Sequence, residues 1–541
     1  DLIARINNEA VESVAVCLLF SFLHPGHEQQ IASALRKIGL FVSLSSEVLP
    51  EYREYERTST TVLNAYVSPI IDGYLSSLES SLTDMDHPYH LRIMQSNGGI
   101  ISVNEARQAG VRCIVSGPAG GVVGASYIGS SALAESTFHH DGYQNSQLKI
   151  ITFDMGGTST DVSLVDQQPS ISTESIVGGF PIGIPMLDVH TIGAGGGSIA
   201  RMDLGGALRV GPDSAGADPG PACYALGDSS SDLPTVTDAN VVLGRLPVDH
   251  FLGGEILLDQ RRANEVMKKL GAALGTDAIA AAQGVIDVVN AHMERALRFV
   301  TIERGNDPEE FVLLSFGGAG GLHAVQLARR LSIPKVIVPP IASTLSAYGM
   351  LVAEVIKDYS RTVMFTGEVE KDQLDGVFLP LLAQGRADLR SEGIQDNRIR
   401  YEPSLDMRYR GQSYELNIPF REKFIPDFHR AHELDYGYAH PGAEVEIVNI
   451  RLRAVGISTP PEIPSFPGGN GVPSNALLGN RAVVVSHQRV EIPIYQGELL
   501  SPGDYLEGPA VIVRKDTTIY LPRASTVVVD RFLNQVISII D

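Results

Sequence analysis

The segment FDMGGTSTDVSLV, residues 153–165, constrains this chain more than any other part of it. The apolar runs LKIITF and VSLV flank it, which predicts two strands joined by a tight turn at Gly156 and Gly157. Glycine lets a backbone adopt φ > 0 and approach a ligand closely. Successive backbone N–H groups in such a turn bind anions. On this segment alone, a structural hairpin with ordinary turn chemistry is the alternative.

Acidic and hydroxyl side chains surround this turn. Asp154 ends the first predicted strand, and Thr158, Ser159 and Thr160 line the turn. A carboxylate beside an anion-binding turn would repel phosphate unless a divalent cation lay between them, and Mg²⁺ prefers oxygen ligands of this kind. The segment therefore predicts a loop that binds the phosphates of a magnesium nucleotide.

Length and charge limit the class of protein. A chain of 541 residues is too long for one core and predicts three or four domains. The net charge of −21 disfavours nucleic acid and anionic membranes as partners. No apolar run approaches the ~20 residues of a membrane span, and the first residues do not form a signal peptide. Three scattered cysteines, Cys17, Cys113 and Cys223, predict reduced thiols and a cytoplasmic protein.

Hydrophobic periodicity predicts the main elements of the first two thirds of the chain. Strands are expected at 12–22, 41–49 and 90–102. Helices are expected at 27–39, at 51–82 with a kink at Pro69, after the glycine-rich start at Ser116–Gly121, and at 277–305.

Other stretches lack such a period. Residues 129–147 are polar and predict a surface loop, whereas 176–227 combine many glycines with no long helix and predict a rigid, site-forming loop region. After about residue 360, short alternating segments bounded by Pro and Gly predict an all-β region of about ten strands. Its one clear helical insert is expected at 424–440.

A second glycine-rich segment, SFGGAGGLHA at 315–324, predicts a strand, a turn and a helix whose N-terminus faces a ligand. Taken alone, close packing of strand and helix explains it equally well. Two such segments separated by a long helix resemble the layout of the actin, Hsp70 and sugar-kinase superfamily, in which two α/β domains close over ATP.

Longer stretches carry a more specific resemblance, to the hydantoinase A/oxoprolinase family. They occur in family order from about residue 12 to the end of the chain. The matching stretches are LLFSFLHPGHE, SSEVLPEYREYERTSTTVLNAYVSP, MQSNGGI, SGPAGGVVGA, FDMGGTSTDVSLV, DVHTIGAGGGSIA, VGPDSAGADPGPACY, TVTDANVVLGRL, FGGAGGLHAVQLARRL, STLSAYGML and DMRYRGQSYEL.

The resemblance implies an ATP-dependent amidohydrolase with an actin-like ATPase core. ATP would phosphorylate the carbonyl oxygen of a cyclic amide such as 5-oxoproline, a hydantoin or another lactam. Phosphorylation turns a poor electrophile into one with a leaving group, and the protein supplies positioning and charge neutralisation. The family further implies ATP and Mg²⁺ as cofactors, a hydantoinase B-type partner subunit and an oligomer. One branch instead activates acetone for carboxylation.

The resemblance also assigns roles by motif. Asp154 would hold Mg²⁺ through water with help from Asp161, while Gly156, Gly157, Thr158 and Thr160 would cradle the β- and γ-phosphates. The residues that would hold adenosine and its α-phosphate are Gly317, Gly318, Gly320 and Gly321. The segment that would lie near the cleft, with packing as the alternative, contains Ser116, Gly117, Gly120 and Gly121.

Asp188, His190 and Asp218 are the candidate substrate or catalytic residues. Eukaryotic-type 5-oxoprolinases carry Asn at the position of His190 and His at that of Asp218, so this chain resembles the hydantoinase and acetone-carboxylase branch. A histidine between acids could orient substrate, act as acid and base, or bind a metal, and a hydrogen-bonded structural histidine is the alternative. For His323, capping or packing is expected rather than catalysis.

The chain departs from the family at one point. The family carries a first phosphate hairpin of Asp-x-Gly-Gly-Thr-Phe-Thr-Asp type near its N-terminus, and no such sequence precedes residue 154. The missing part corresponds to roughly 100–150 residues by typical domain size. We therefore expect weak ATP binding and three regions: 1–61 as the remainder of an N-terminal actin-like domain, 62–360 as the ATPase core and 361–541 as a β-rich domain. The missing hairpin also keeps open a non-catalytic nucleotide clamp.

Overall fold

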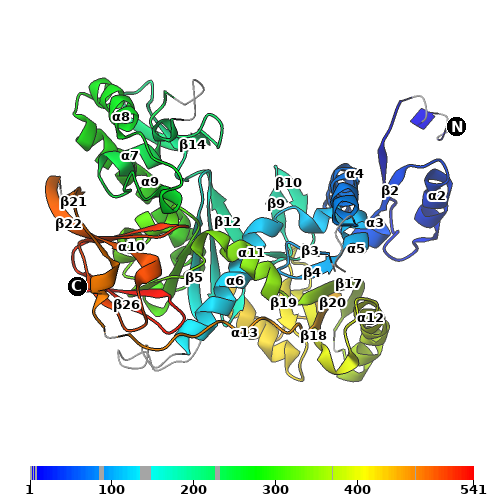
Figure 1. Ribbon diagram of the computed structural model, residues 1–541. Coiled ribbons are helices and arrows are strands. Elements are labelled where there is room, and N and C mark those ends of the chain that lie inside the picture. Colours follow the sequence, from blue (N-terminus) through cyan, green and yellow to red (C-terminus); the bar gives the residue numbers. More distant parts are fainter. Residues whose placement is uncertain are drawn as a thin grey trace. The chain divides into compact units, whose positions relative to one another are not determined.

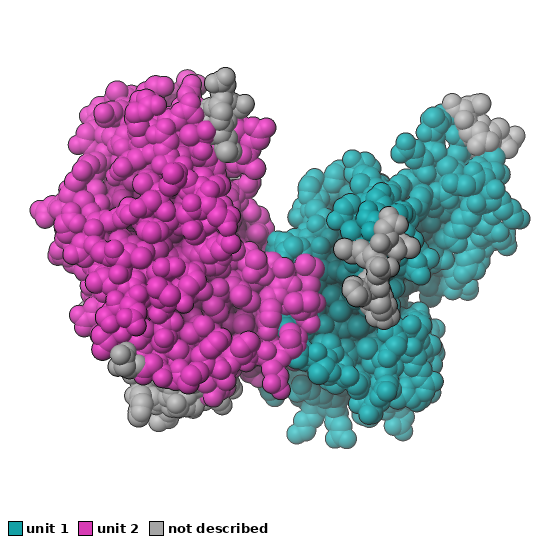
Figure 2. Space-filling model, in the orientation of Figure 1, with its two compact units in different colours: residues 1–119, 171–187, 352–460 teal, residues 120–170, 188–351, 461–541 magenta. Residues whose placement is uncertain are grey.

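The computed structural model describes residues 3, 5–6, 9–83, 91–134, 148–225, 232–367, 369–469, 471–485 and 487–540. It is an α/β protein with mixed sheets, which confirms the expected class (Figure 1). The chain forms two compact units, each made of three stretches (Figure 2). Unit 1 contains residues 1–119, 171–187 and 352–460, and unit 2 contains 120–170, 188–351 and 461–541. The three regions expected from the sequence stay a prediction. Neither of the boundaries between them coincides with a boundary between the two units.

The first part of unit 1 is a small parallel sheet with helices on it. Strand β1 (Ser13–Val16) pairs with β2 (Phe41–Leu44), and α2 (Gly26–Arg36) connects them. The short α3 (Ser45–Val48) and the long α4 (Glu54–Thr83), with Pro69 inside it, follow. The apolar core between β1, β2 and α2 contains Val16, Ala32, Leu35 and Leu44.

The expected strand at 12–22 is wrong beyond Val16. The N–H of Leu18 donates to the buried carboxylate of Glu28 at 2.9 Å, and its carbonyl accepts from Arg57 at 3.1 Å. These two bonds take the groups that a longer strand would use for its ladder, so the chain turns away. The strand expected at 41–49 likewise ends at Leu44, where α3 begins.

The larger sheet of unit 1 has the order β19-β18-β20-β17-β4-β3. The bounds are β3 (Arg92–Met94), β4 (Ile100–Ser102), β17 (Val355–Thr366), β18 (Ile399–Tyr409), β19 (Leu416–Pro419) and β20 (Val445–Gly456). The strand expected in 90–102, ending at Asn97-Gly98-Gly99, is β3, and the residues after these glycines form β4, which pairs with it antiparallel.

Two of the described helices, α12 and α13, lie in sequence between β17 and β20 of this sheet. Helix α13 (Phe424–Tyr436) matches the expected insert, but the 21-residue helix α12 (Lys371–Ser391) contradicts the expectation of a single helix there. Sequence reading missed α12 because Gly376, Pro380 and Gly385 lie inside it, and such residues disfavour an isolated helix. Tertiary packing overrides them, since one face of the helix buries Leu374, Phe378, Leu381 and Leu389.

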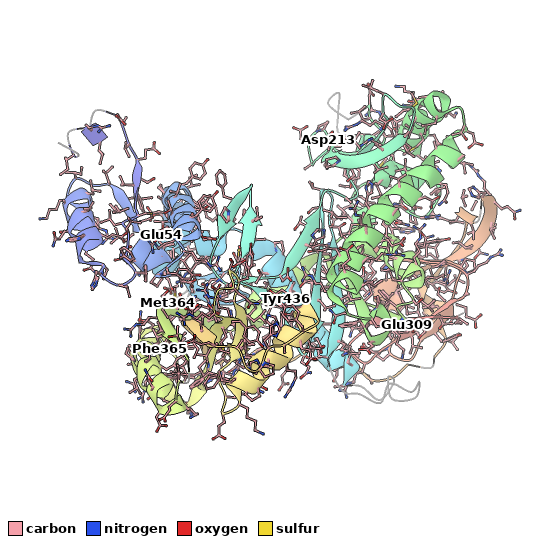
Figure 3. The ribbon with its side chains drawn as sticks, turned by 180° about the vertical axis from the view of Figure 1, so that it is seen from behind. Glu54, Asp213, Glu309, Met364, Phe365 and Tyr436 are labelled. Carbon is pink, nitrogen blue, oxygen red and sulfur yellow. The ribbon has the colours of Figure 1, made fainter. Side chains whose placement is uncertain are left out.

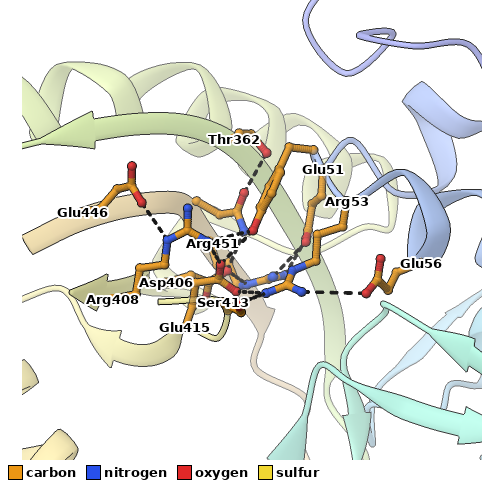
Figure 4. Close-up of polar contacts among 12 residues, drawn as sticks. Glu51, Arg53, Glu56, Thr362, Asp406, Arg408, Ser413, Glu415, Glu446 and Arg451 are labelled. Carbon is orange, nitrogen blue, oxygen red and sulfur yellow. Dashed lines mark hydrogen bonds and ion pairs between the residues drawn. The ribbon is translucent and has the colours of Figure 1, made fainter. Parts of the chain in front are cut away.

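Charged residues tie the loop before α4 to this sheet (Figure 4). Arg451 on β20 pairs with Glu51 at 2.8 Å and with Asp406 at 2.7 Å, and all three side chains are almost fully buried. Arg53 pairs with Glu415 at 2.6 Å. Burial raises the pKa of Glu51, even though the neighbouring guanidinium opposes that rise.

The sheet of unit 2 has the order β12-β6-β5-β15-β16-β27-β26-β23, with β7 on β6. Its bounds are β5 (Lys149–Met155), β6 (Thr160–Asp166), β7 (Gln168–Pro169), β12 (Val189–Ile192), β15 (Val312–Phe316), β16 (Lys335–Val338), β23 (Tyr505–Glu507), β26 (Ser525–Val529) and β27 (Gln535–Ile539). The antiparallel hairpin expected at 153–165 is confirmed as β5 and β6. Strand β15 is parallel to β5 and β16 and is buried throughout.

The helices of unit 2 are α6 (Ser116–Leu133, whose first turn falls in unit 1), α7 (Val236–Val242), α8 (Gln260–Leu274), α9 (Ala278–Val300), α10 (Ala324–Arg330) and α11 (Leu345–Val352). The helix expected at 277–305 is confirmed as α9. The loop expected at 129–147 is wrong at its start, because 129–133 belong to α6, and its remainder from 135 lies outside the described residues. Figure 3 shows Glu309 in the segment that leads into β15, and Tyr436 at the end of α13.

The stretch 176–227, expected as a loop region without a long helix, contains several short strands. They are β9 (Ser175–Val177), β10 (Phe180–Ile182), β11 (Met186–Leu187), β13 (Ser198–Met202) and β14 (Leu208–Ser214), and β8 (Ile171–Ser172) precedes them. A four-stranded sheet near the C-terminus contains β21 (Leu477–Val485), β22 (Gln488–Gln496), β24 (Ala510–Val513) and β25 (Thr518–Leu521). In the described part of the chain, no single helix is long and apolar enough to cross a membrane. One bent pair of helices, 260–274 with 278–304, meets that test of length and composition together.

Candidate functional site

The ends of three neighbouring strands of unit 2 place two carboxylates side by side. Asp154 on β5 stands opposite Asp161 on β6, and Asp161 stands opposite Thr191 on β12. Directly opposite residues share one face of a sheet, so these three side chains form a row. The Thr191 hydroxyl donates to Asp161, and the Ser346 hydroxyl at the start of α11 lies 3.5 Å from Asp154.

Within the part of the chain that the structure describes, Asp154 and Asp161 have no positively charged partner. Among the described residues, no ion pair joins Asp154 or Asp161 to a lysine, arginine or histidine. Burial, and then the charge of Asp161, raises the pKa of Asp154 to about 6. Burial also raises the pKa of Asp161, although the bond from Thr191 opposes it. Like charges directly opposite each other destabilise a sheet, so this arrangement suits a bound cation.

The turn between β5 and β6 presents backbone N–H groups. Two of its carbonyls are occupied, because Gly156 O accepts from Gly196 N–H at 3.0 Å and Gly157 O accepts from Gly197 N–H at 2.6 Å. Within the described residues, no hydrogen bond takes the N–H of Gly157 or Thr158. The turn therefore offers donors to an anion at the end of the strands that carry the two acids.

Glycine contributes to this turn in a different way from the one expected. Neither Gly156 nor Gly157 has a positive φ; both instead have open space where a Cβ would point, which allows a ligand to approach closely. The steric demand falls on Gly195, whose Cβ would lie 2.6 Å from Gly157 C and from Thr158 N. Gly195 thus lets the segment 194–197 lie against the turn.

The expectation that the Thr160 side chain lines the phosphate site is wrong. Thr160 is fully buried, and its hydroxyl donates to the carbonyl of Ala194. Thr160 is the first residue of β6, and strand alternation points its side chain inward. It therefore holds the segment 194–197 in place. Thr158 in the turn itself is exposed.

The second glycine-rich segment lies beside the same carboxylate. Gly317 has φ +75°, and a Cβ on it would lie 2.4 Å from Asp154 Oδ1, so only glycine fits there. The turn reaches the first hairpin through the N–H of Ala319, which donates to Met155 O at 3.0 Å. Gly318 is exposed, whereas Gly320 and Gly321 are buried. The two segments predicted to form one site are thus adjacent in unit 2.

The helix after this turn differs from the expectation. A 3-10 turn at Gly320–Leu322 intervenes, and α10 begins only at Ala324 and has seven residues. His323 is buried, and its Nδ1 lies 2.7 Å from Asn290 Oδ1. Burial and the nearby Arg245 lower the pKa of His323 to about 3, and the capping or packing role expected for it stays a prediction.

The glycine-rich start of α6 is used for packing. A Cβ on Gly120 would lie 2.6 Å from Ser346 O, and one on Gly121 would lie 2.8 Å from the ring of Phe316. These two glycines let α11 approach, and α11 carries the Ser346 hydroxyl beside Asp154. Ser116 and Gly117 form the first turn of α6, and Gly117 has open space around its Cβ direction.

His190 points away from the carboxylate row. Its neighbours in register are Val162 and then Phe153, and it alternates with Thr191, so it lies on the other face of the sheet. Its ring packs on Phe299 of α9 with centroids 4.4 Å apart. Burial, followed by the charge of Arg304, lowers the pKa of His190. His190 therefore does not lie with Asp154 and Asp161.

Of the other two candidates, Asp188 lies near His190 and Asp218 does not contact it among the described residues. Asp188 immediately precedes β12, its charge acts on His190, and it forms an ion pair with Arg304 after α9. Asp218 is exposed in a loop whose neighbouring residues, Ser214 and Gly216, lie beside Gly197. Among the described residues, no hydrogen bond or ion pair connects Asp218 to Asp188 or His190. These three residues do not form one catalytic cluster here.

Sequence reasoning missed Thr191, Gly195 and Ser346. The motifs DVHTIGAGGGS and STLSAYGML contain them, but only strand register and helix packing reveal what they contact. In the described ranges, no three or more His, Cys, Asp or Glu side chains are grouped to hold a metal. Two carboxylates are nevertheless enough for Mg²⁺, which commonly uses one or two of them together with waters and substrate phosphates.

Comparison with known proteins identifies the family. The hydantoinase/oxoprolinase model matches residues 57–359, and the model of the hydantoinase/oxoprolinase C-terminal domain matches 367–534. The chain belongs to the hydantoinase/oxoprolinase family. The resemblance inferred from the motifs is confirmed.

Several relatives in the family cover nearly all of this chain. The caprolactamase alpha subunit of Pseudomonas jessenii is 34% identical over 95% of this chain and 74% of its own length. The crystal structure of the ATP-dependent caprolactamase from that organism matches with a TM-score of 0.86 at 33% identity, over 99% of this chain and 78% of that one. A nucleotide-free acetone carboxylase structure matches with a TM-score of 0.78 at 27% identity, over 99% and 77%.

The 5-oxoprolinase of Saccharomyces cerevisiae is 33% identical over 96% of this chain. Here the match spans only 41% of the relative, so the chain corresponds to less than half of that enzyme.

Proposed function

We propose that this chain is the ATP-using subunit of an enzyme that phosphorylates and opens a cyclic amide. The observation that carries the proposal is the pair Asp154 and Asp161, which face each other beside two glycine-rich turns and receive no counter-charge from the described residues. The similarity to an ATP-dependent caprolactamase over 99% of the chain supports the reaction class. Its substrate would be a hydantoin, 5-oxoproline or a related lactam.

In this proposal unit 2 is an actin-like ATPase domain that holds Mg-ATP. Asp154 and Asp161 would bind Mg²⁺ through water, and the N–H groups of Gly157 and Thr158 would bind the terminal phosphates. Gly317 and Gly318 would face the nucleoside. The raised pKa of Asp154 supports this, because a divalent cation would offset the repulsion between the carboxylates and bring that pKa down again.

The reaction divides into three steps. The lactam carbonyl oxygen attacks the γ-phosphorus, and the bond from that phosphorus to the β,γ-bridging oxygen breaks, which releases ADP. Water then adds to the carbon of the phosphorylated imidate. The C–N bond breaks and the nitrogen takes a proton, which leaves an acyl phosphate. A second water then hydrolyses the acyl phosphate to a carboxylate and free phosphate. This chain would orient the nucleotide and neutralise phosphate charge, which is the main work of the protein in phosphoryl transfer.

A ketone carboxylase is the second candidate, and the similarity to acetone carboxylase favours it. Both reactions phosphorylate an oxygen to activate carbon, so the nucleotide site would serve either. A non-catalytic nucleotide clamp is the third. A hydantoinase B-type partner, an oligomer and a cytoplasmic location remain proposals. The partner and the oligomer rest on the subunit name of the caprolactamase relative. The location rests on three cysteines that form no disulfide with one another.

Phosphate release from ATP tests the proposal. The full-length protein is assayed with and without a B-type partner, against 5-oxoproline, hydantoins, caprolactam and acetone. Stimulation by one cyclic amide is the expected result and identifies the substrate class. Stimulation by acetone with bicarbonate would favour the carboxylase. Bound ATP with no stimulation by any compound would leave the clamp.

A further inference from the structure

A hairpin of the C-terminal region lies against the second glycine-rich turn. Strands β24 and β25 are antiparallel, and Arg514 N–H donates to Thr517 O at 2.9 Å, which closes a turn of residues 514–517. The Thr517 hydroxyl donates to Gly318 O at 3.2 Å and lies 3.5 Å from Gly317 O. A Cβ on the exposed Gly318 would lie 3.8 Å from Asp516 O. A ligand resting on Gly318 would therefore also reach this hairpin turn.

Further contacts fix the hairpin turn to the neighbouring loop of the same unit. Asp516 Oδ2 accepts from Ser343 N–H at 3.2 Å, and Arg514 Nη2 donates to Pro340 O at 3.1 Å. That loop also holds the glycine turn, because Gly317 N–H donates to Ala342 O at 2.9 Å. Residues 317–318, 340–343 and 514–517 are thus bonded to one another.

Steric fit shows the same relationship. A Cβ on Gly321 would lie 2.6 Å from Thr518 O, so the hairpin occupies the space that any larger residue would need. At the other end of the turn, a Cβ on Gly317 would lie 2.4 Å from Asp154 Oδ1. Gly317 therefore lies between the C-terminal hairpin and Asp154, the carboxylate that carries the proposed metal.

The hydroxyl of Thr517 has a physical reason to matter for binding. Glycine loses more conformational freedom on ordering than any other residue, and the turn contains four glycines between residues 317 and 321. A turn held in shape before the ligand arrives spares the complex that ordering cost. Such preorganisation affects ligand affinity more than the chemical step.

We propose that the turn at residues 514–517 forms one wall of the nucleotide site, with Thr517 as a positioning residue for Gly317 and Gly318. The C-terminal region thereby contributes directly to nucleotide affinity. This inference rests on the proposed function, because it takes the glycine turn to face a nucleoside.

Thr517→Val tests the hydroxyl, Thr517→Ser restores it, and Thr518→Val is the matched control. Among the described residues, no hydrogen bond joins the Thr518 side chain to the glycine turn. Titration calorimetry with Mg-AMP-PNP should give a Kd about 3- to 10-fold weaker for Thr517→Val, as expected for one hydrogen bond. Thr517→Ser and Thr518→Val should stay within twofold of wild type. With ATP as substrate, KM should rise and kcat should remain within twofold.

Thermal unfolding separates positioning from general stability. The rise in Tm caused by Mg-AMP-PNP should shrink in Thr517→Val, because ligand stabilisation follows Kd. An equal loss of Tm with and without nucleotide, at unchanged Kd, would overturn the inference. If Thr517→Val does not fold, the partly exposed Asp516→Ala replaces it and should weaken binding about 2- to 5-fold. Unchanged nucleotide affinity in Asp516→Ala would also overturn the inference.

The two proposals fail in different ways. A wild-type chain that binds no nucleotide contradicts the proposed function itself. A wild-type chain that binds Mg-AMP-PNP, with the same Kd in Thr517→Val, contradicts only the role of the hairpin.

Discussion

Buried and half-buried carboxylates have opposite surroundings in the two units. In unit 1, Glu51 and Asp406 share Arg451, and Asp358 accepts two bonds from Arg453. In unit 2, Asp154 and Asp161 face each other, and the described residues supply hydroxyl groups rather than cations. Paired acids fix strands to one another, whereas unpaired acids cost stability until a cation binds. The contrast separates the structural charge network from the candidate site.

The largest expected effect comes from breaking the pairing in unit 1. Arg451→Met leaves Glu51 and Asp406 buried together without a cation, and should lower the free energy of unfolding by about 3–5 kcal/mol. Denaturant unfolding at pH 7 measures it. Arg410→Met is the control, because its pair with Glu444 is exposed and should cost less than about 1 kcal/mol. Equal losses in both variants would contradict the comparison.

Asp154→Ala should abolish magnesium-dependent turnover. The proposed metal loses its anchor, and a loss of about 100-fold or more is expected from missing metal-ion catalysis. Phosphate release under saturating ATP measures it. Asp166→Asn, on an exposed residue at the far end of β6, should leave turnover unchanged. Turnover of Asp154→Ala within twofold of wild type would remove Asp154 from the mechanism.

The same carboxylate should make the metal-free protein less stable. The pKa of Asp154 is raised from 3.8 to about 6 in the folded state. The loss of stability caused by its negative charge is therefore absent below pH 4 and complete above pH 6. In EDTA, Asp154→Asn should therefore be more stable than wild type by about 1–3 kcal/mol at pH 7. The gap should close as the pH falls from 6 to 4. A variant less stable than wild type at pH 7 would show that Asp154 is a structural acid.

Asp358 should show the opposite sign. Burial alone would raise the pKa of its carboxyl, but Arg453 and the bond from Asn97 bring it below 3.8. Its contribution to stability is therefore present above pH 4 and lost as the pH falls through the lowered pKa. Asp358→Asn should be less stable than wild type at pH 7, with the gap narrowing in acid. Denaturant unfolding between pH 3 and 7 tests both acids together.

His190→Asn should have the smallest effect. The structure places this ring on Phe299, away from the carboxylate row, so the variant should lose about 0.5–1.5 kcal/mol of stability from the lost ring contact. Turnover and ATP affinity should stay within about twofold. A tenfold loss of turnover with normal ATP affinity would return His190 to a substrate site, as the motif comparison suggested.

Local sequence patterns predicted the parts of the site that lie within one segment. The β5–β6 hairpin, Asp154 at its end and the strand–turn order before α10 follow from apolar runs and glycines. Thr160 could not be placed correctly, because its side-chain direction depends on the strand register that begins at that residue. Helix α12 was missed, since its packing on the sheet of unit 1 outweighs the glycines and proline inside it.

By itself, the sequence determined the family, the α/β class and the two glycine-rich turns, because these depend on residues close together in the chain. Only the tertiary structure decided that Asp154 faces Asp161, that His190 lies on the opposite face, and that Thr517 bonds to Gly318 across 199 residues of sequence. Register and packing set these contacts. A shift of one residue in a strand would reverse which side chains face the ligand, and no local pattern records that choice.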